Sequence, residues 1–595
     1  MSLSTYQSLS SEYSAKKSLL RKQLGWLSLF RLLLFIVLAF FVYKSFQTGA
    51  SYFILLSVAS LVCFFIIVGL YDKLNTRSVF YKALVKLNED EINFLAGQPS
   101  VYDNGKEYID PQHPYSYDLG IFGEAGLLSF LNRTSTQFGK AALSNALLYS
   151  NTAFIEKRQQ AVKELKDKLE FRQHIQAYGM VEETKEKEIH QLKVWINSPS
   201  LFNNKILYYG LCVFPVITIG LLVSYFVSEN DALLNLLIGS FILNLIISFL
   251  FARKISLHLS VSTSVTKILQ QFTKQLKEIE KQSFQSELLK EIQEKLRSGN
   301  RTASQNIARL AQLFNYLEMV MNIVTSLLLN GLFLFHIHIL HLLEKWKKEQ
   351  GSHIMKWLQL LGEIEALNSF ANFSFNNPSF CYPEVNSTEI LAATNMGHPL
   401  VRNRTRVDNN ISFDKQKIVV LTGSNMSGKS TFLRTLGINL ILAKAGSPVC
   451  AEQFTFYPYD VYVSMNISDS LKDSESFFYA ELKRLQHIIQ QLQKGNKTFV
   501  ILDEILRGTN SNDKHSGTVG LIRKLADMKA SGIIATHDLT VSELEKEYPN
   551  YISNKCLESE TINDELHFDY KLRDGVCTTL TASFLMKKMG IIESK

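Results

Sequence analysis

Cysteine is scarce in this chain of 595 residues, and its six cysteines form no CxxC pair. Cys63 and Cys212 lie inside apolar runs, and the other four are scattered. This spacing argues against a disulfide framework or a zinc site and fits a reducing cytosol. The excess of positive over negative charge is small as well. A net charge of +8 permits contact with anionic lipid or nucleic acid but demands neither.

Charged residues are nearly absent from four long apolar runs, in which much of the 46% hydrophobic content is concentrated. Each run has about the ~20 residues that a helix needs to cross a bilayer. The alternative for any one run is a buried core helix. Arg31 interrupts the first run, near enough to one end for its guanidinium to reach the interface. The four expected membrane spans are 26–43, 52–71, 206–227 and 232–251.

Basic residues flank the two hairpins that these runs form, whereas the short turns carry one lysine and two acids. The positive-inside rule places such basic flanks in the cytosol. We therefore expect a multi-pass protein, such as one of the bacterial inner membrane, with both termini and all large soluble parts cytoplasmic. The flanking residues are Lys16, Lys17, Arg21, Lys22, Lys73, Arg77, Lys205, Arg253 and Lys254.

A fifth apolar stretch, 319–343, contains His336, His338 and His341. Three histidines facing lipid would be costly, so we expect one long buried or interfacial helix rather than a span. The spacing of the histidines does not place them on one helical face, which disfavours a metal site.

A phosphate-binding loop follows the apolar run 417–421, which is typical of a buried strand. Residues 423–430 match G-x-x-x-x-G-K-[ST], and the sequence continues in a helical pattern. In such a loop, backbone N–H groups surround phosphate oxygens. Lys429 then reaches the β- and γ-phosphates, and the Ser430 hydroxyl takes Mg²⁺.

Two more apolar runs end in polar residues suited to nucleotide hydrolysis. One ends in Asp503 and Glu504, and the other in His537. An acid at a strand end holds Mg²⁺, and the next acid orients the attacking water as general base. His537 is suited to sensing the γ-phosphate. Strands separated by helical patterns predict a parallel α/β sheet with its chemistry at the carboxyl edge.

Together these motifs resemble the ATPase of the MutS mismatch-repair family, within the ABC-type ATPases. The loop "GSNMSGKST" is similar to the family's G-P-N-M-G-G-K-S-T, and "DEILRGTNSND" to its D-E-[IL]-G-R-G-T-S-T-x-D. "SESFFYAE" resembles the signature segment that, in ABC-type ATPases, closes the partner's site. The resemblance implies nucleotide binding by Gly423, Ser424, Asn425, Met426, Ser427, Gly428, Lys429, Ser430 and Thr431, with Ser476 acting in trans.

Upstream segments extend the resemblance to about 115–200 and 300–592, but with departures. The family's mismatch-reading domain precedes its lever, and here about 115 residues with a membrane hairpin occupy that place. A second hairpin interrupts the helical lever where the family has its DNA clamp. An aromatic residue for adenine stacking is missing near Arg406, whose guanidinium face is one substitute. The expected units are a hairpin 1–75, lever 76–200, second hairpin 201–254, lever 255–380 and ATPase domain 381–595.

The fold class expected is thus a C-terminal α/β P-loop ATPase domain, preceded by an all-α lever and two transmembrane hairpins. The resemblance implies a homodimer whose ATP- and Mg²⁺-dependent closure moves the levers. Residues 252–310 carry eleven Lys or Arg and five acids in a helical pattern, which favours a solvated helix whose basic end meets anionic lipid. The alternative for that stretch is contact with DNA phosphates, without mismatch specificity, in a repair or recombination role. The alternative functions are a nucleotide-driven membrane organiser and an ABC-like transporter, although no L-S-G-G-Q signature is present.

Overall fold

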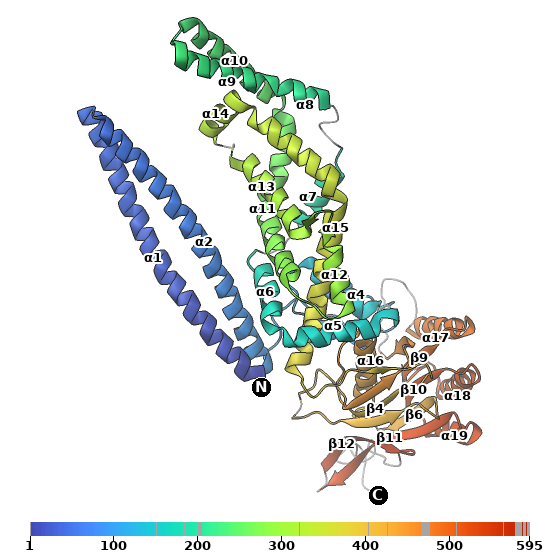
Figure 1. Ribbon diagram of the computed structural model, residues 1–595. Helices are drawn as coiled ribbons and strands as arrows, with labels where there is room; N and C mark the ends of the chain where they lie inside the picture. Colours follow the sequence, from blue (N-terminus) through green and yellow to red (C-terminus); the bar gives the residue numbers. More distant parts are fainter. Residues whose placement is uncertain are drawn as a thin grey trace.

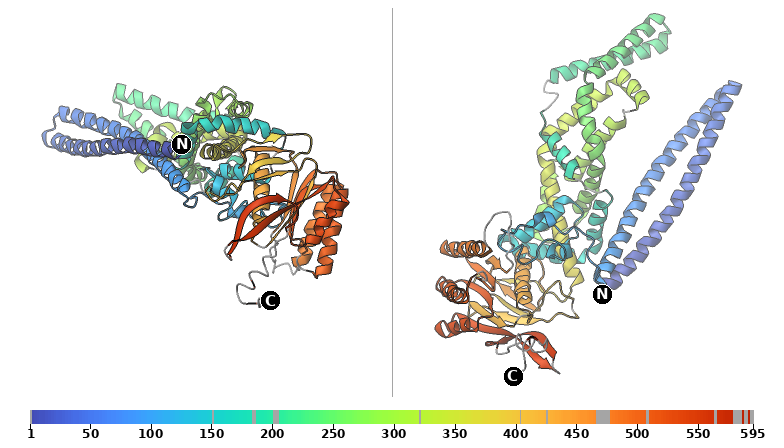
Figure 2. Two further views of the ribbon diagram at one scale, coloured as in Figure 1. Left: turned by 90° about the horizontal axis from the view of Figure 1, so that it is seen from below. Right: turned by 180° about the vertical axis from the view of Figure 1, so that it is seen from behind.

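The computed structural model describes residues 2–149, 152–182, 186–199, 205–319, 322–402, 404–424, 426–465, 477–506, 509–562, 565–577, 586 and 591. An α/β domain forms the C-terminal end, and two elongated helical parts extend from it toward the same side of the molecule (Figure 1, Figure 2). We call the pair α1–α2 the first hairpin and the region α3–α15 the helical arm.

The first hairpin consists of α1 (Ser2–Thr48) and α2 (Ser51–Leu95), joined by a turn at Gly49. Both helices continue well beyond the apolar runs 26–43 and 52–71, so the end nearer the α/β domain is polar. The Arg31 guanidinium lies 5.2 Å from the ring centroid of Tyr71, at the end of the second run. The one charged side chain within the first apolar run therefore lies near the end of that run that continues into the polar part of the hairpin.

The helical arm has α11 and α15 as its longest members (Figure 1). Its helices before the second hairpin are α3 (Leu127–Leu131), α4 (Gln137–Leu148), α5 (Ile155–Asp167), α6 (Leu169–Gly179) and α7 (Glu186–Asn197), with 3₁₀ turns η1 (Lys106–Tyr108) and η2 (Thr152–Phe154). The rest are α8 (Lys205–Leu211), α9 (Val213–Ser228), α10 (Asp231–Leu250), α11 (Ala252–Lys281), α12 (Glu287–Lys295), the short hairpin β1 (Arg297–Ser298) and β2 (Arg301–Thr302), α13 (Ala303–Met319), α14 (Ile323–Phe333) and α15 (Phe335–Asn376).

The stretch 319–343 is not one long helix, so that expectation is wrong. A break at Leu334, whose φ is +49°, separates α14 from α15. The side-chain oxygen of Asn330 accepts the backbone N–H of His336 at 3.0 Å, which satisfies a donor at the start of α15. Much of α14 is exposed, with Ile323 75% accessible. Tyr208 stacks on His341 and hydrogen-bonds to His338, so two of the histidines pack against α8.

Polar groups join α14 to the second hairpin, α9–α10. Asn244 donates to the carbonyl oxygen of Gly331 at 2.8 Å and to the hydroxyl of Thr218 at 2.9 Å. Thr218 and Ser240 lie 2.6 Å apart. A side chain at Gly331 would collide with Phe241, so glycine is what allows α14 to approach α10. These contacts tie the second hairpin to the helix that leads into α15.

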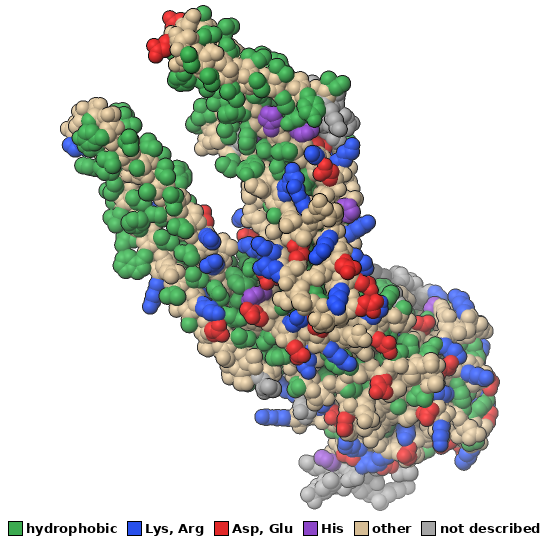
Figure 3. Space-filling model, viewed as in Figure 1, with side chains coloured by type: hydrophobic (Ala, Val, Ile, Leu, Met, Phe, Trp, Pro, Cys, Tyr) green, Lys and Arg blue, Asp and Glu red, His purple; other side chains and the backbone are tan. Residues whose placement is uncertain are grey.

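Four helical segments in the described parts of the chain are long and apolar enough to cross a membrane. They are Ser2–Thr48, Ser51–Leu95, Tyr208–Ser228 and Asp231–Leu250, and α13 with α14 makes a fifth only if joined across 320–321, outside the described residues. Apolar side chains cover the far end of the first hairpin and the far end of the helical arm (Figure 3). Phe226 and Phe249, for example, are 74% and 78% exposed. Apolar surface on this scale marks an interaction site.

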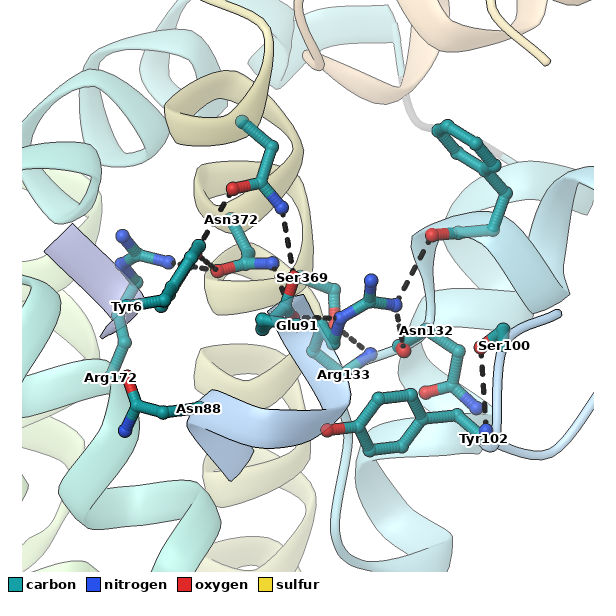
Figure 4. A network of polar contacts seen from close by, with 12 residues as sticks. Tyr6, Asn88, Glu91, Ser100, Tyr102, Asn132, Arg133, Arg172, Ser369 and Asn372 are labelled. Carbon is teal, nitrogen blue, oxygen red and sulfur yellow. Dashed lines mark hydrogen bonds and ion pairs between the residues drawn. The ribbon is translucent and has the colours of Figure 1, made fainter. Parts of the chain in front are cut away.

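A buried polar network joins the first hairpin to the base of the helical arm (Figure 4). Glu91 of α2 pairs with Arg133 and accepts a hydrogen bond from Asn372 of α15 at 2.9 Å. Tyr6 of α1 and Arg172 of α6 both donate to the side-chain oxygen of the same asparagine, at 3.1 and 2.8 Å. Groups from four elements thus satisfy one another, which fixes the hairpin's polar end to the last turns of α15.

The α/β domain contains two sheets. The six-stranded sheet has the order β12-β11-β6-β10-β9-β8, and all its neighbours pair in parallel except β11 with β12. The four-stranded sheet has the order β3-β7-β4-β5. The strands are β3 (Glu384–Val385), β4 (Ala392–Met396), β5 (Asn409–Ser412), β6 (Ile418–Gly423), β7 (Gln453–Phe456), β8 (Asp460–Ser464), β9 (Thr498–Asp503), β10 (Ser531–Thr536), β11 (Ile552–Ile562) and β12 (Glu565–Asp574). The helices are α16 (Lys429–Ala445), α17 (Phe477–Gln493), α18 (Ser511–Asp527), η3 (Leu539–Glu543) and α19 (Leu544–Glu547).

The three strands expected from sequence, β6, β9 and β10, are adjacent and parallel, with β10 in the middle. Every residue of these three strands is buried. Because parallel neighbours end at one edge, the polar residues that follow them come together there. The α/β class predicted for the C-terminal region is confirmed, and the region before it is helical.

Candidate nucleotide site

The loop between β6 and α16 is shaped to surround an anion. Gly428, immediately before α16, has a φ of +96°, and a side chain there would meet the ring of Tyr570. Only glycine fits this left-handed, crowded position at low cost. The hydroxyl oxygens of Ser424 and Ser427 are buried and have no partner among the described atoms. A helix N-terminus with such groups around it is suited to a phosphate.

Lys429 is the first residue of α16, and only 5% of its surface is exposed. Its ammonium donates to the carbonyl oxygens of Gly423 and Ser424 at 2.8 and 3.0 Å. It also lies 3.4 Å from Nε2 of His537, at the end of β10. The loop lysine and the strand-end histidine expected from sequence are therefore neighbours.

Ser430 and Asp503 form the second pair. The Ser430 hydroxyl donates to Oδ2 of Asp503 at 2.5 Å, which links the start of α16 to the end of β9. Oδ1 of Asp503 is buried and has no hydrogen-bond partner among the described atoms. An unsatisfied carboxylate oxygen beside a hydroxyl is a donor set that Mg²⁺ accepts.

Glu504 has a φ of +47°, a conformation that is rare for a residue with a side chain. Its N–H donates to the carbonyl oxygen of Ala535 on β10 at 3.0 Å. Its carboxylate lies 2.5 Å from Nε2 of His537. The strained backbone thus holds this carboxylate at the sheet edge, in contact with His537, which also lies beside the ammonium of Lys429.

A cavity of about 440 Å³ opens beside these groups. Ser424, Met426, Gly428, Lys429, Ser430, Thr431 and Glu504 line it, and Gly423, Ser427, Asp503 and His537 lie next to lining residues. Asn425 and Ser476 are outside the described residues.

Tyr570 of β12, which the sequence reasoning missed, supplies an aromatic ring to the cavity. The ring lies against Gly428, and the backbone of Tyr570 has a φ of +54°. Asn409 of β5 holds this part of β12, because its side chain donates to the carbonyl oxygen of Tyr570 at 3.0 Å. The aromatic residue itself is visible in the segment "YKLRDG", but nothing in that segment indicates that its tyrosine reaches the loop.

Arg406 lines the same cavity, but its guanidinium is engaged elsewhere. It forms an ion pair with Asp408 at 2.7 Å and lies over the ring of Phe380. Tyr570 is therefore the better stacking group. Burial lowers the pKa of His398, another lining residue, to about 4, and its Nδ1 accepts the backbone N–H of Leu400. This imidazole is neutral at neutral pH.

Two contacts frame the segment that contains Ser476. Glu481 of α17 is buried and accepts the N–H of Leu506, just after the Asp503–Glu504 pair, at 2.9 Å. On the other side, Asp118 accepts the N–H of Met465 at 2.9 Å and pairs with Arg484 at 2.6 Å. The polypeptide that follows the first hairpin therefore contacts both flanks of the signature segment.

A central parallel sheet, a glycine-rich loop at a helix start, and polar residues at neighbouring strand ends define the P-loop class of nucleotide-binding folds. Residues 419–588 match the family described as MutS domain V. The chain is 33% identical over 239 residues to the DNA mismatch repair protein MutS of Thermotoga maritima, which covers 39% of this chain and 29% of that protein. It is 32% identical over 235 residues to the protein of the same name from Finegoldia magna, covering 38% and 27% of the two chains.

The resemblance to the MutS family predicted from the motifs is confirmed, and the C-terminal part of the chain is related to that family through its ATPase domain. The chain spans less than a third of the length of these curated relatives, since the Thermotoga maritima match covers 29% of that protein.

Proposed function

We propose that this protein is a membrane-anchored, Mg²⁺-dependent ATPase whose nucleotide cycle moves the helical arm and, with it, the two hairpins. The observation that carries this proposal is the cluster of Lys429, Ser430, Asp503, Glu504 and His537 at the carboxyl edge of the sheet, beside a cavity of about 440 Å³. Pockets of small-molecule ligands have volumes of this order.

The residues present fit a nucleotide with Mg²⁺. Ser430 and the free oxygen of Asp503 would hold the ion, whose role is to neutralise charge on the phosphates. Lys429 would exchange its bonds to loop carbonyls for phosphate oxygens. The ring of Tyr570 would stack on the base.

Glu504 is the proposed general base, and His537 its positioning partner. A carboxylate that accepts a proton from water must lie within reach of both water and the γ-phosphate. Glu504 lines the cavity and contacts His537, which in turn lies near the loop lysine. These contacts support a carboxylate that lines the cavity and is oriented by the imidazole of His537.

Two structural connections support coupled motion of the nucleotide site, the helical arm and the first hairpin. α15 runs from the second hairpin and α14 down to the α/β domain, and the network around Glu91 ties the first hairpin to its final turns. The loop bearing Asp118 contacts both flanks of the signature segment. A change at the nucleotide site would therefore reach both hairpins through packed helices.

The test is ATP turnover by the full chain purified in a neutral detergent. Glu504→Gln should bind ATP as tightly as the unaltered protein but hydrolyse it about 10²–10⁴-fold more slowly, because only the proton acceptor is lost. Lys429→Ala should lose tight binding, and chelation of Mg²⁺ should stop turnover.

Glu543→Gln, which alters an exposed carboxylate of the same domain, is the matched control and should leave turnover unchanged. Normal turnover by Glu504→Gln would show that another group activates the water. Membrane anchoring is checked separately, because a chain released from membranes by alkaline carbonate would not be an integral membrane protein.

A further inference from the structure

A groove of about 500 Å³ lies where the first hairpin passes the helical arm. Residues of α2, α11 and α13 line it. Three lining side chains are cationic: Lys73 and Arg77 of α2, and Lys274 of α11. Among the described residues that line the groove, none is acidic, and the others carry hydroxyl, amide or methyl groups. The cations come from elements that are far apart in sequence, so the fold itself gathers this charge.

The cation of Lys274 is partly removed from water. Burial lowers the pKa of this ammonium, and its Nζ lies 5.9 Å from the ring centroid of Tyr178. A cation held in such a place gains from an anion nearby more than an exposed cation does. Ala308 and Ala311 of α13 present only methyl groups to the groove, which leaves room for a group the size of a phosphate.

The groove lies at the level where the first hairpin would leave a bilayer. Lys73 comes two residues after Tyr71, the end of the apolar run 52–71. The ring of Tyr71 already holds the Arg31 guanidinium at that level. Lys and Arg side chains gather where the two apolar arms converge (Figure 3). Phosphate headgroups occupy this depth, at the edge of the hydrocarbon core.

We propose that this groove binds the phosphate headgroup of an anionic phospholipid, which links α2 to the helical arm across the gap between them. The inference rests on the membrane anchoring proposed above. Basic pockets between membrane helices on the cytoplasmic side are suited to such headgroups. The phosphate would accept hydrogen bonds from Lys73, Arg77 and Lys274 together.

The experiment uses native mass spectrometry of the full chain in neutral detergent, titrated with phosphatidylglycerol or phosphatidylcholine. The unaltered protein should retain phosphatidylglycerol about tenfold more tightly or better. The triple variant Lys73→Gln, Arg77→Gln, Lys274→Gln should lose that preference. The charge-preserving variant Lys73→Arg, Arg77→Lys, Lys274→Arg should keep it, which separates lost charge from misfolding.

The matched control is Lys82→Gln, Lys86→Gln, Lys277→Gln. It removes two cations from α2 and one from α11, all exposed and all outside the groove, and should keep the preference. Equal loss in both glutamine triples, or no preference in the unaltered protein, would overturn the inference. If inorganic phosphate displaced the lipid at an equal concentration, the site would be one for small anions instead.

Alkaline carbonate extraction of membranes distinguishes the two proposals. A chain that stays in the membrane but lacks the phosphatidylglycerol preference contradicts the headgroup site alone. A chain released by carbonate contradicts the membrane anchoring on which the site rests.

Discussion

At the scale of single residues, the candidate site depends on backbone conformations that the fold must enforce. Glu504 and Tyr570 both have positive φ, at +47° and +54°, and both line the cavity. Such conformations cost roughly 1–3 kcal/mol each and persist only where neighbours hold them. Ala535 holds the first through its carbonyl oxygen, and Asn409 holds the second. The strain is thus located where the side chains would meet a nucleotide.

Tyr570→Ala tests the stacking role of this ring. Stacking of a base on an aromatic side chain contributes about 1–3 kcal/mol, so the Kd for ATP should rise roughly 5- to 150-fold. Tyr570→Phe keeps the ring and the same backbone strain and should bind ATP within about twofold of the unaltered protein. Isothermal titration with the non-hydrolysing Glu504→Gln background measures both. Equal affinity of the alanine and phenylalanine variants would remove Tyr570 from the base site.

The sequence predicted the site residues that lie together in one short motif. It did not predict those that reach the site through contacts between segments far apart in the chain. Lys429 and Ser430 follow from one loop, and Asp503 and Glu504 from one strand end, so local patterns predict their neighbourhood. Tyr570 reaches the cavity through the pairing of β11 with β12 and the side chain of Asn409. No local pattern contains that information. The ion pair that engages Arg406 was equally invisible, since Asp408 follows it at a spacing with no fixed geometry in a loop.

At the scale of elements, the order of strands in the main sheet was predictable only in part. Buried β-branched runs identified β6, β9 and β10, but the antiparallel edge strand β12 and the separate sheet β3-β7-β4-β5 depend on contacts between distant segments. The break between α14 and α15 was missed because hydropathy continues smoothly across it. The break is stabilised by a side-chain contact, in which the backbone N–H of His336 donates to the side-chain oxygen of Asn330.

The loop after the first hairpin is expected to stabilise the α/β domain through Asp118. This carboxylate is fully buried, whereas its partner Arg484 is 20% exposed. Asp118→Ala would leave the N–H of Met465 without its acceptor and remove the charge partner of Arg484, whose guanidinium still donates to the carbonyl oxygen of Pro111; the cost should be about 1–3 kcal/mol. Thermal unfolding of the detergent-purified protein should show a lower midpoint. ATP turnover should fall as well, because Asp118 holds residues on both sides of the signature segment, Met465 before it and Arg484 after it.

Arg523→Ala is the comparison for this variant. It breaks the ion pair with Glu547, which is 49% and 43% exposed on its two sides. Exposed pairs contribute little, so the unfolding midpoint should hardly change. If both variants lowered the midpoint equally, burial of the Asp118 pair would not be what stabilises the domain.

At the scale of the whole molecule, both hairpins extend away from the α/β domain on the same side (Figure 1). We propose that two α/β domains meet, each closing the other's site with its signature segment. Four hairpins would then rise from one dimer. Each closing and opening of the nucleotide sites would then move all four hairpins. In this way, ATP hydrolysis outside the membrane would act on the bilayer that contains the hairpins.

Mixed dimers test this arrangement. A Lys429→Ala chain lacks a working loop, and a Ser476→Arg chain lacks a working signature, so each alone should be inactive. In a mixed dimer, one of the two sites pairs an intact loop with an intact signature, and part of the ATP turnover should return. Differently tagged chains, purified sequentially, provide verified mixed dimers. No recovery in them would contradict a shared site.

The hairpin ends of the molecule are poorly suited to contact with DNA. The far end of the helical arm carries Glu229 and Asp231 at the turn of an apolar hairpin. Neither acids nor exposed apolar helices favour phosphates. Base discrimination needs groove contacts or readout of deformed DNA. We expect any DNA binding to involve the backbone alone, to weaken steeply with salt and to ignore mismatches. Competition between matched and single-mismatch duplexes of equal length, at two salt concentrations, measures this. A mismatch preference of about tenfold, or roughly 1.4 kcal/mol, would show instead that part of this chain reads mismatched bases.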